Sequence, residues 1–186
     1  MGDWENQTAV VLASGPSAAA AQVELARDRA RILVINESWR LAPWADALFA
    51  TDATWWDRRG GCPEFKGRKF CASANAAKAW QLEVFVSPGP TSGLRGIFLA
   101  EKLGANPILL LGFEHHVRNG VHWHPPHQGR NPGKPEMVFW RHEIERMGPG
   151  FAKRGTKVIN CTPDSALKCF PFLPFLEAIN GGHSPR

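Results

Sequence analysis

Apolar runs alternate with helix-forming stretches along the first part of the chain. The run TAVVLAS (8–14) is rich in β-branched residues, and the alanine-rich AAAAQVELARDRA (18–30) that follows it consists of strong helix formers. Two further apolar runs come next, RILVINES (31–38) and ADALFATD (45–52). The pattern predicts a strand, a helix and two more buried strands.

The remainder of the chain continues this alternation. Its expected elements are strands at 67–73 (GRKFCAS) and 81–87 (QLEVFVS), a helix over 94–104, the most strand-like run at 106–114 (NPILLLGFE), an amphipathic stretch over 135–148, a last strand at 156–162 (TKVINCT) and a short carboxyl-terminal helix. Strands that alternate with helices predict an α/β fold with a mainly parallel sheet, covered by helices on both faces.

Composition sets the size and class of the protein. With 186 residues, 44% of them hydrophobic, the chain can form one α/β domain with a sizeable core, so we expect a single domain over 1–186. The net charge of +5 would suit an anionic partner, but the basic residues are scattered among 17 acids, and a nucleic-acid role is not indicated.

The cysteine spacing, the amino-terminal segment and the length of the apolar stretches bear on localisation. The four cysteines show no CxxC spacing, the amino end MGDWENQ is unlike a signal peptide, and no stretch reaches the roughly 20 apolar residues of a membrane span. We therefore expect a cytoplasmic protein with reduced thiols and no membrane span.

The turn after the first strand carries the first candidate chemistry. In an open parallel sheet, ligands bind at the carboxyl ends of the strands, and the first turn often holds phosphate. Gly15 would let the backbone approach a ligand, Pro16 is preset for a first helical turn, and Ser17 offers a hydroxyl beside unpaired amides. The same three residues are equally typical of an ordinary helix start.

Similar chemistry recurs at three other positions. Thr91, Ser92 and Gly93 stand at the start of the predicted helix over 94–104, where they could face the same sheet edge. Asn36 and Asp52 each close an apolar run, and strand ends are where polar contacts to ligands belong. Taken alone, each of these residues could equally serve as a cap or turn residue.

Five of the seven histidines fall within a His- and Pro-rich loop over 115–135. Histidine titrates near neutral pH and is also the commonest transition-metal ligand, so the loop could supply a general base or a metal site. The spacing of His122, His124 and His127 could form a three-ligand zinc site, although no HExxH or CxxC motif is present. A solvated loop with at most one functional histidine is the alternative.

Tryptophans could contribute stacking surfaces. Trp55, Trp56 and Trp123 are expected in loops near the proposed pocket, where indole rings stack on sugars or bases. Trp80 and Trp140 are expected to pack in the core.

Five segments in order carry a resemblance to known proteins: VVLASGPS, ILVINESW, ADALFATD, TSGLRGIFLAEKLGANPILLLGFE and VINCTPDSAL. Together they resemble a group of Rossmann-like nucleotide-using proteins, namely the bacterial lipooligosaccharide sialyltransferases and the hydroxymethylpterin diphosphokinase-like proteins found in archaea and phages. The resemblance spans about residues 8–167 and implies a Rossmann-like three-layer sandwich.

The resemblance also implies roles for individual residues. Nucleotide phosphate would lie at Gly15, Pro16 and Ser17, the ribose and phosphate beside Asn36 and Asp52, and Thr91, Ser92 and Gly93 would complete the nucleotide pocket. In the sialyltransferases a histidine before the last strand is the general base, which implies His127, with His124 and His122 as the next candidates.

Two departures from the family pattern leave alternatives open. The sialyltransferases stabilise the leaving phosphate with tyrosines, and this chain has none. Glu114 stands where the family usually has Asp, and together with His122, His124 and His127 it is a candidate metal ligand. We expect a glycosyltransferase-like enzyme that uses a CMP-sugar-like donor and a small acceptor. The alternatives are a diphosphokinase-like enzyme that uses ATP with Mg²⁺, and a non-catalytic nucleotide- or metal-binding phage protein.

Overall fold

A computed structural model describes residues 2–125 and 132–181. Seven strands form one sheet, and all of its pairings are parallel: β1 (Ala9–Leu12), β2 (Arg31–Ile35), β3 (Ala47–Ala50), β4 (Arg68–Cys71), β5 (Glu83–Val84), β6 (Ile108–Leu111) and β7 (Val158–Asn160). The helical segments are α1 (Ala20–Glu24), the 3₁₀-helix η1 (Asn36–Arg40), α2 (Ala53–Arg58), α3 (Ala74–Trp80), α4 (Ser92–Lys102), α5 (Lys134–Met147), α6 (Pro149–Lys153) and α7 (Phe175–Gly181). The expected α/β fold with a parallel sheet, consistent with a Rossmann-like sandwich, is confirmed.

The order of the strands creates a switch point in the middle of the sheet. Strand order is β5-β4-β3-β2-β1-β6-β7, so the chain first builds outward from β1 and then returns through α4 to place β6 on the other side of β1. In register, Val11 lies opposite Leu33 of β2 and Leu110 of β6. Crevices at the carboxyl ends of strands beside such a reversal are the usual ligand sites of open α/β sheets.

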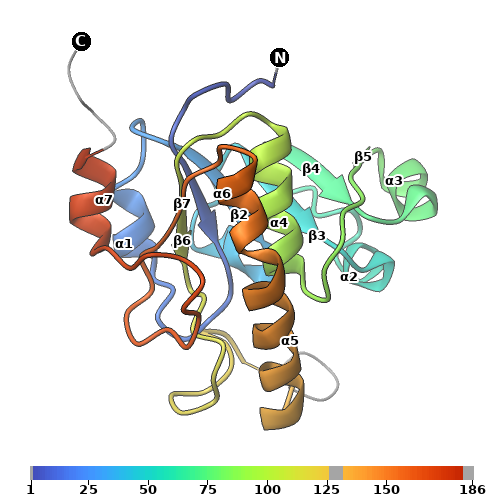
Figure 1. Ribbon diagram of the computed structural model, residues 1–186. Coiled ribbons are helices and arrows are strands. Elements are labelled where there is room, and N and C mark those ends of the chain that lie inside the picture. Colours follow the sequence, from blue (N-terminus) through green and yellow to red (C-terminus); the bar gives the residue numbers. More distant parts are fainter. Residues whose placement is uncertain (1, 126–131, 182–186) are drawn as a thin grey trace.

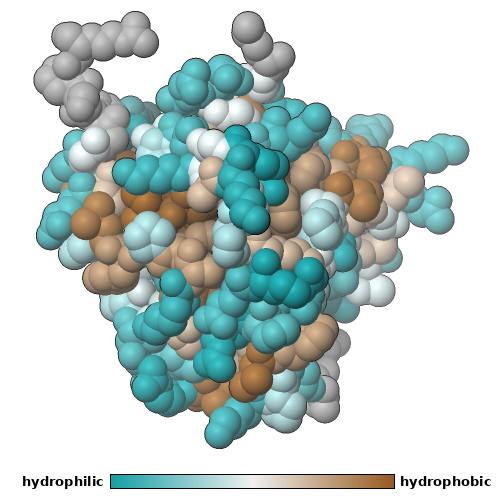
Figure 2. Space-filling model, in the orientation of Figure 1, coloured by the Kyte–Doolittle hydropathy of each residue, from teal (hydrophilic) through white to brown (hydrophobic). Residues whose placement is uncertain are grey.

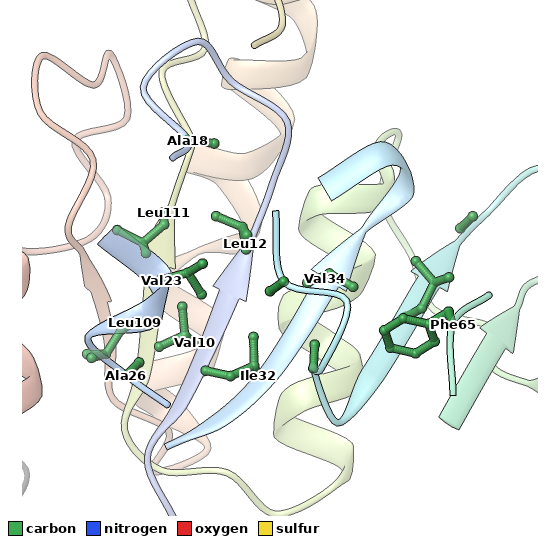
Figure 3. Close-up of a cluster of buried hydrophobic side chains, with 14 of the residues drawn as sticks. Val10, Leu12, Ala18, Val23, Ala26, Ile32, Val34, Phe65, Leu109 and Leu111 are labelled. Carbon is green, nitrogen blue, oxygen red and sulfur yellow. The ribbon is translucent and has the colours of Figure 1, made fainter. Parts of the chain in front are cut away.

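Two apolar cores lie on the two faces of the sheet because side chains alternate along each strand. Val10 and Leu12 of β1 join the core that includes Val23 just before the end of α1, and Figure 3 shows these three side chains pointing toward one another. The neighbouring residue Val11 joins the other core, which is covered by α4 and includes Ile144 of α5. Figure 1 shows α4, α5 and α6 on one side of the sheet.

The first helix is shorter than the sequence predicts. A helix over 18–30 was expected, but α1 ends at Glu24 and the chain continues in tight turns, with the Leu25 amide bonded to the Gln22 carbonyl at 3.3 Å. Asp28 adopts a φ of +59°, a left-handed conformation that a right-handed helix cannot contain. The turns redirect the chain into β2.

The surface is mostly polar, with local apolar clusters. Figure 2 shows apolar side chains gathered around β5, the edge strand, where Val84 and Val86 are 54% and 69% exposed. Within the described ranges, no helix has the length and apolar character needed to cross a membrane.

Candidate functional site

A cavity of about 320 Å³ lies at the carboxyl ends of the strands around the switch point. Its walls come from segments that follow β1, β2, β3 and β6, from the start of α4, and from α2 and α5. The lining residues are Ala13, Ser14, Gly15, Ile35, Asn36, Thr51, Asp52, Trp55, Arg58, Pro90, Thr91, Ser92, Gly93, Gly112, Phe113, Glu114, His115, His116, Val121, His122, Pro132, Met137 and Trp140. Two other hollows, of about 550 and 630 Å³, lie elsewhere on the surface and include none of the predicted site residues.

The structure gathers most of the predicted nucleotide-binding residues at this cavity. The residues of that set that line it are Gly15, Asn36, Asp52, Thr91, Ser92 and Gly93. Pro16 and Ser17 are absent from its walls. The gathered residues come from four separate segments of the chain, so the fold rather than sequence proximity brings them together.

A carboxylate of the protein itself occupies the turn after β1. The Ser17 amide donates a hydrogen bond to Oε1 of Glu114 at 2.6 Å. A methyl group placed on Gly15 would overlap Oε2 of the same carboxylate and would lie 2.5 Å from the Gly112 carbonyl oxygen. The turn also does not lead directly into a helix, because α1 starts at Ala20 and is only five residues long. Gly15 is therefore required for the close approach of Glu114.

The loop after β7 holds Glu114 and its neighbour in place. The Phe113 amide donates to Oγ1 of Thr162 at 3.0 Å, and Oγ of Ser165 donates to the Phe113 carbonyl at 2.6 Å. The Glu114 carbonyl accepts from the Ala166 amide at 2.8 Å. These bonds to buried groups make the tip of β6 a rigid wall of the cavity.

The start of α4 is joined to the end of β3. Oγ of Ser92 donates to Oγ1 of Thr51 at 2.9 Å, and the Thr91 side chain caps α4 by accepting from the Leu94 amide at 3.2 Å. The first bond between backbone groups in this helix runs from the Arg95 amide to the Thr91 carbonyl, so the amides of Ser92 and Gly93 precede the helical ladder. Helix amides of this kind, with the helix dipole behind them, favour an anion.

One face of α2 forms a further wall of the cavity. Asp52, which directly precedes α2, and Trp55 and Arg58 of α2 follow one another at three-residue spacing, and all three line the cavity. Buried Glu37 holds this face in position because its Oε1 accepts from Nε1 of Trp55 at 3.1 Å and lies 2.6 Å from Nη2 of Arg59. The cavity therefore has an acid, an indole edge and a guanidinium along one wall.

The histidines differ in what they contact. His115 lines the cavity, its Nδ1 atom is buried, and burial lowers its pKa to about 4, with smaller contributions from the charges of Arg141 and His116. His116 is held by Asp164, whose carbonyl lies 2.9 Å from Nε2, while its Nδ1 accepts from the Arg118 amide at 3.3 Å. His115 is therefore neutral at neutral pH, and both ring nitrogens of His116 have structural partners.

The other two described histidines of the loop lie one against the other. The rings of His122 and His124 are stacked at 5.0 Å between centroids, and His122 lines the cavity with its Nδ1 atom 3.3 Å from the Ser14 carbonyl. His124 is buried, and its Nδ1 atom lies 2.8 Å from the Pro125 carbonyl. His127, the first candidate for the general base, lies outside the described residues.

The proposed metal site gains no support within the described ranges. No three His, Cys, Asp or Glu side chains there come together as a metal-binding group. Glu114 points at the turn after β1, and the rings of His122 and His124 stack instead of converging on one point.

The tryptophans are arranged differently from the prediction. Trp55 and Trp56 do not lie in a loop: they belong to α2, and Trp56 is fully buried. Trp123 packs on the core and donates from Nε1 to Oγ of Ser38 at 3.3 Å. Trp140, expected in the core, lines the cavity from α5, whereas Trp80 packs against the core as predicted.

Sequence reasoning missed three residues that shape the site. Glu37 lies in the NESW segment, where an acid inside an otherwise apolar stretch is a usable signal for a buried partner. Arg58 could have been found from its spacing of six residues from Asp52, had a helix been recognised there. Thr51 carries no such signal, because its role depends on contact with Ser92, which lies 41 residues away.

Comparison with models of known protein families and with curated proteins finds no match to this chain.

Proposed function

We propose that this protein is a nucleotide-dependent transferase whose donor nucleotide occupies the cavity at the carboxyl ends of the strands. The observation that carries the proposal is the gathering of Asn36, Asp52 and the 91–93 segment around one cavity beside the switch point. Open α/β sheets bind nucleotides at this position, and the residues that meet here offer the polar groups that a nucleotide needs.

Each wall suits a different part of a nucleotide. The amides of Ser92 and Gly93 and the guanidinium of Arg58 would bind phosphate, whereas the side chains of Asn36 and Asp52 would bond to ribose hydroxyls or base edges. Arg58 would take over the role that tyrosines have in the resembling sialyltransferases. A phosphate held by a cation and helix amides is a better leaving group because the charge that develops on it is stabilised.

The transfer step needs a group that accepts a proton. An acceptor hydroxyl would attack the sugar carbon, the bond from that carbon to the phosphate oxygen would break, and the hydroxyl proton would pass to a histidine. Of the described histidines that line the cavity, we take His122 as the candidate, because its ring lies at the end of β1, with Nδ1 3.3 Å from the Ser14 carbonyl oxygen. His127 stays the candidate that the resemblance implies.

The second candidate function is transfer of pyrophosphate from ATP with Mg²⁺. It is favoured by the presence of two carboxylates, Asp52 and Glu114, on the walls of one cavity. Magnesium is usually held by one or two carboxylates together with phosphate oxygens and water. Of these two, Asp52 fits that role better, because Oε1 of Glu114 already accepts the Ser17 amide. Magnesium would supply charge neutralisation between the phosphates.

Replacement of Asn36 tests the proposal without straining the backbone. Asn36 has a φ of +50°, so Asn36→Gly removes the side-chain carboxamide at a position where glycine is favoured. The matched control is Asn6→Gly, because Asn6 has a φ of +56° and lies away from this cavity. Wild type and both variants are titrated calorimetrically with CMP, UMP, ADP and nucleotide-sugars.

We expect at least one nucleotide to bind the wild type, with affinity about tenfold weaker in Asn36→Gly and unchanged in Asn6→Gly. Turnover of a nucleotide-sugar supports the first function, and turnover of ATP the second. Binding with no turnover of either favours a non-catalytic nucleotide-binding protein. Absence of binding by every nucleotide contradicts the proposal.

A further inference from the structure

The turn that resembles a phosphate cradle already contains a negative charge of the protein. Oε1 of Glu114 accepts the Ser17 amide, and Oε2 lies against Gly15, where even a methyl group would not fit. The residue is 4% exposed. A carboxylate here takes up the amide and the space that a phosphate would need.

This carboxylate is fixed in place. Its residue is anchored through the backbone to the loop after β7, by the Ala166 amide and by the bonds that Thr162 and Ser165 make to Phe113. Oε2 is buried without a hydrogen-bond partner among the described residues. Movement of Glu114 out of the turn would therefore break a short hydrogen bond and leave the Ser17 amide unsatisfied.

The fixed carboxylate lies close to the start of α4, where the amides of Ser92 and Gly93 could bind a phosphate. A methyl group on Gly93 would lie 3.1 Å from the ring of Phe113, so the start of α4 packs directly against the residue that precedes Glu114. Arg58 lines the same cavity from α2. One phosphate bound at α4 and Arg58 is thus attracted, whereas a chain of phosphates that extends from there toward the turn meets the like charge of Glu114.

We propose that Glu114 is a specificity-determining residue that limits the ligand of this cavity to one phosphate group. The inference rests on the proposed function. It selects nucleoside monophosphates, and donors in which a sugar is joined to a nucleoside monophosphate, over nucleoside diphosphates and triphosphates. In this proposal the turn after β1 excludes a second phosphate, because the carboxylate of Glu114 occupies the position where that phosphate would bind.

The test compares ligands that differ only in the number of phosphates. The wild-type protein is titrated calorimetrically with CMP, CDP and CTP in EDTA, and with the corresponding uridine and adenosine series, so that the preferred base does not affect the comparison. We expect the monophosphate of the preferred base to bind about tenfold or more tightly than its triphosphate.

A charge-neutral variant isolates the carboxylate. Glu114→Gln keeps an oxygen that can accept the Ser17 amide but removes the charge. We expect affinity for the triphosphate to rise about tenfold while affinity for the monophosphate changes less than about threefold. The control with the same change in net charge is Glu177→Gln, because Glu177 is an exposed residue of α7 away from the cavity, and this variant should leave both affinities unchanged.

Several outcomes would overturn the inference while the proposed function stands. One is wild-type affinity for the triphosphate equal to or greater than that for the monophosphate, a result that needs no variant. Another is a folded Glu114→Gln variant that still prefers the monophosphate over the triphosphate as strongly as the wild type does. A third is triphosphate binding that requires added Mg²⁺ and is lost in Glu114→Gln, which would make Glu114 a metal-binding residue. If no nucleotide of any series binds, the inference and the proposed function fail together.

Discussion

Replacement of Glu37 should loosen both the fold and the wall of the cavity. Its side chain is 3% exposed, and Oε1 accepts from Nε1 of Trp55 at 3.1 Å and from Nε and Nη2 of Arg59 at 3.1 and 2.6 Å. Glu37→Gln keeps an acceptor for the indole but removes the charge that faces the guanidinium. The perturbation therefore removes the ionic part of the contact while the volume of the side chain is retained.

The magnitude follows from burial on the two sides of the pair. Hydrogen bonds to charged groups contribute about 1.5–3 kcal/mol each, and the loss of one partner of a buried ion pair costs about 3–5 kcal/mol. The Arg59 side chain is 34% exposed and can turn toward water, so the penalty for leaving it unpaired is reduced. We expect Glu37→Gln to lower the free energy of unfolding by about 2 kcal/mol, and Tm by about 4–8 °C.

Urea denaturation and calorimetry measure this change, and the exposed pair of Glu24 with Arg27 gives the control. Those side chains are 52% and 49% exposed, so Glu24→Gln should cost about 0.5 kcal/mol or less. An effect of Glu37→Gln no larger than that of Glu24→Gln would refute the argument that a buried carboxylate positions α2.

Three further predictions concern other residues of the structure. Gly15→Ala should lower the free energy of unfolding by about 1–3 kcal/mol, because the added methyl group overpacks the turn against Glu114. In a Glu114→Ala background the same substitution should cost less. A double-mutant cycle measured by urea unfolding tests this, and fully additive effects would contradict the contact. The pKa of His115 is lowered from 6.5 to about 4, so the unfolded chain takes up a proton at a higher pH than the folded protein does. The contribution of His115 to stability is therefore fully present above pH 6.5 and is lost as pH falls toward 4. Between pH 7.5 and pH 5 the wild type should lose about 2 kcal/mol more than His115→Asn, a variant that suits the φ of +52°, and equal pH profiles would disprove the shift. Burial raises the pKa of Cys161 to about 12, so iodoacetamide should leave this thiol unmodified in native protein at pH 8 and modify it in urea, as mass spectrometry can show; rapid modification of native protein would count against this burial.

The positions of the strands along the chain could be predicted from local pattern alone. Runs such as NPILLLGFE are apolar, short and bounded by turn residues, and these properties depend on neighbours in sequence. Helix length was less predictable, because the end of α1 depends on the path that leads into β2 and on the left-handed Asp28. The helix α2 was not recognised, since its six residues are too few to show periodicity.

The candidate site was only partly predictable, because several of its contacts join segments that lie far apart in the sequence. Asn36 and Asp52 could be selected because strand ends in a parallel sheet share one edge. The occupation of the turn after β1 by Glu114 could not be foreseen, since the two segments are 97 residues apart and meet only through pairing of β1 with β6. The tie between Ser92 and Thr51 likewise depends on the crossover through α4.

A crystal structure of the protein with the tightest-binding nucleotide of the calorimetric series would show directly where the donor nucleotide binds. We expect the nucleotide to lie in the cavity at the carboxyl ends of β1, β2 and β3, with its phosphate at the amides of Ser92 and Gly93 and at Arg58, and with Glu114 still bonded to the Ser17 amide. A nucleotide bound elsewhere on the protein, or a phosphate seated in the 15–17 turn with Glu114 displaced, would contradict this expectation.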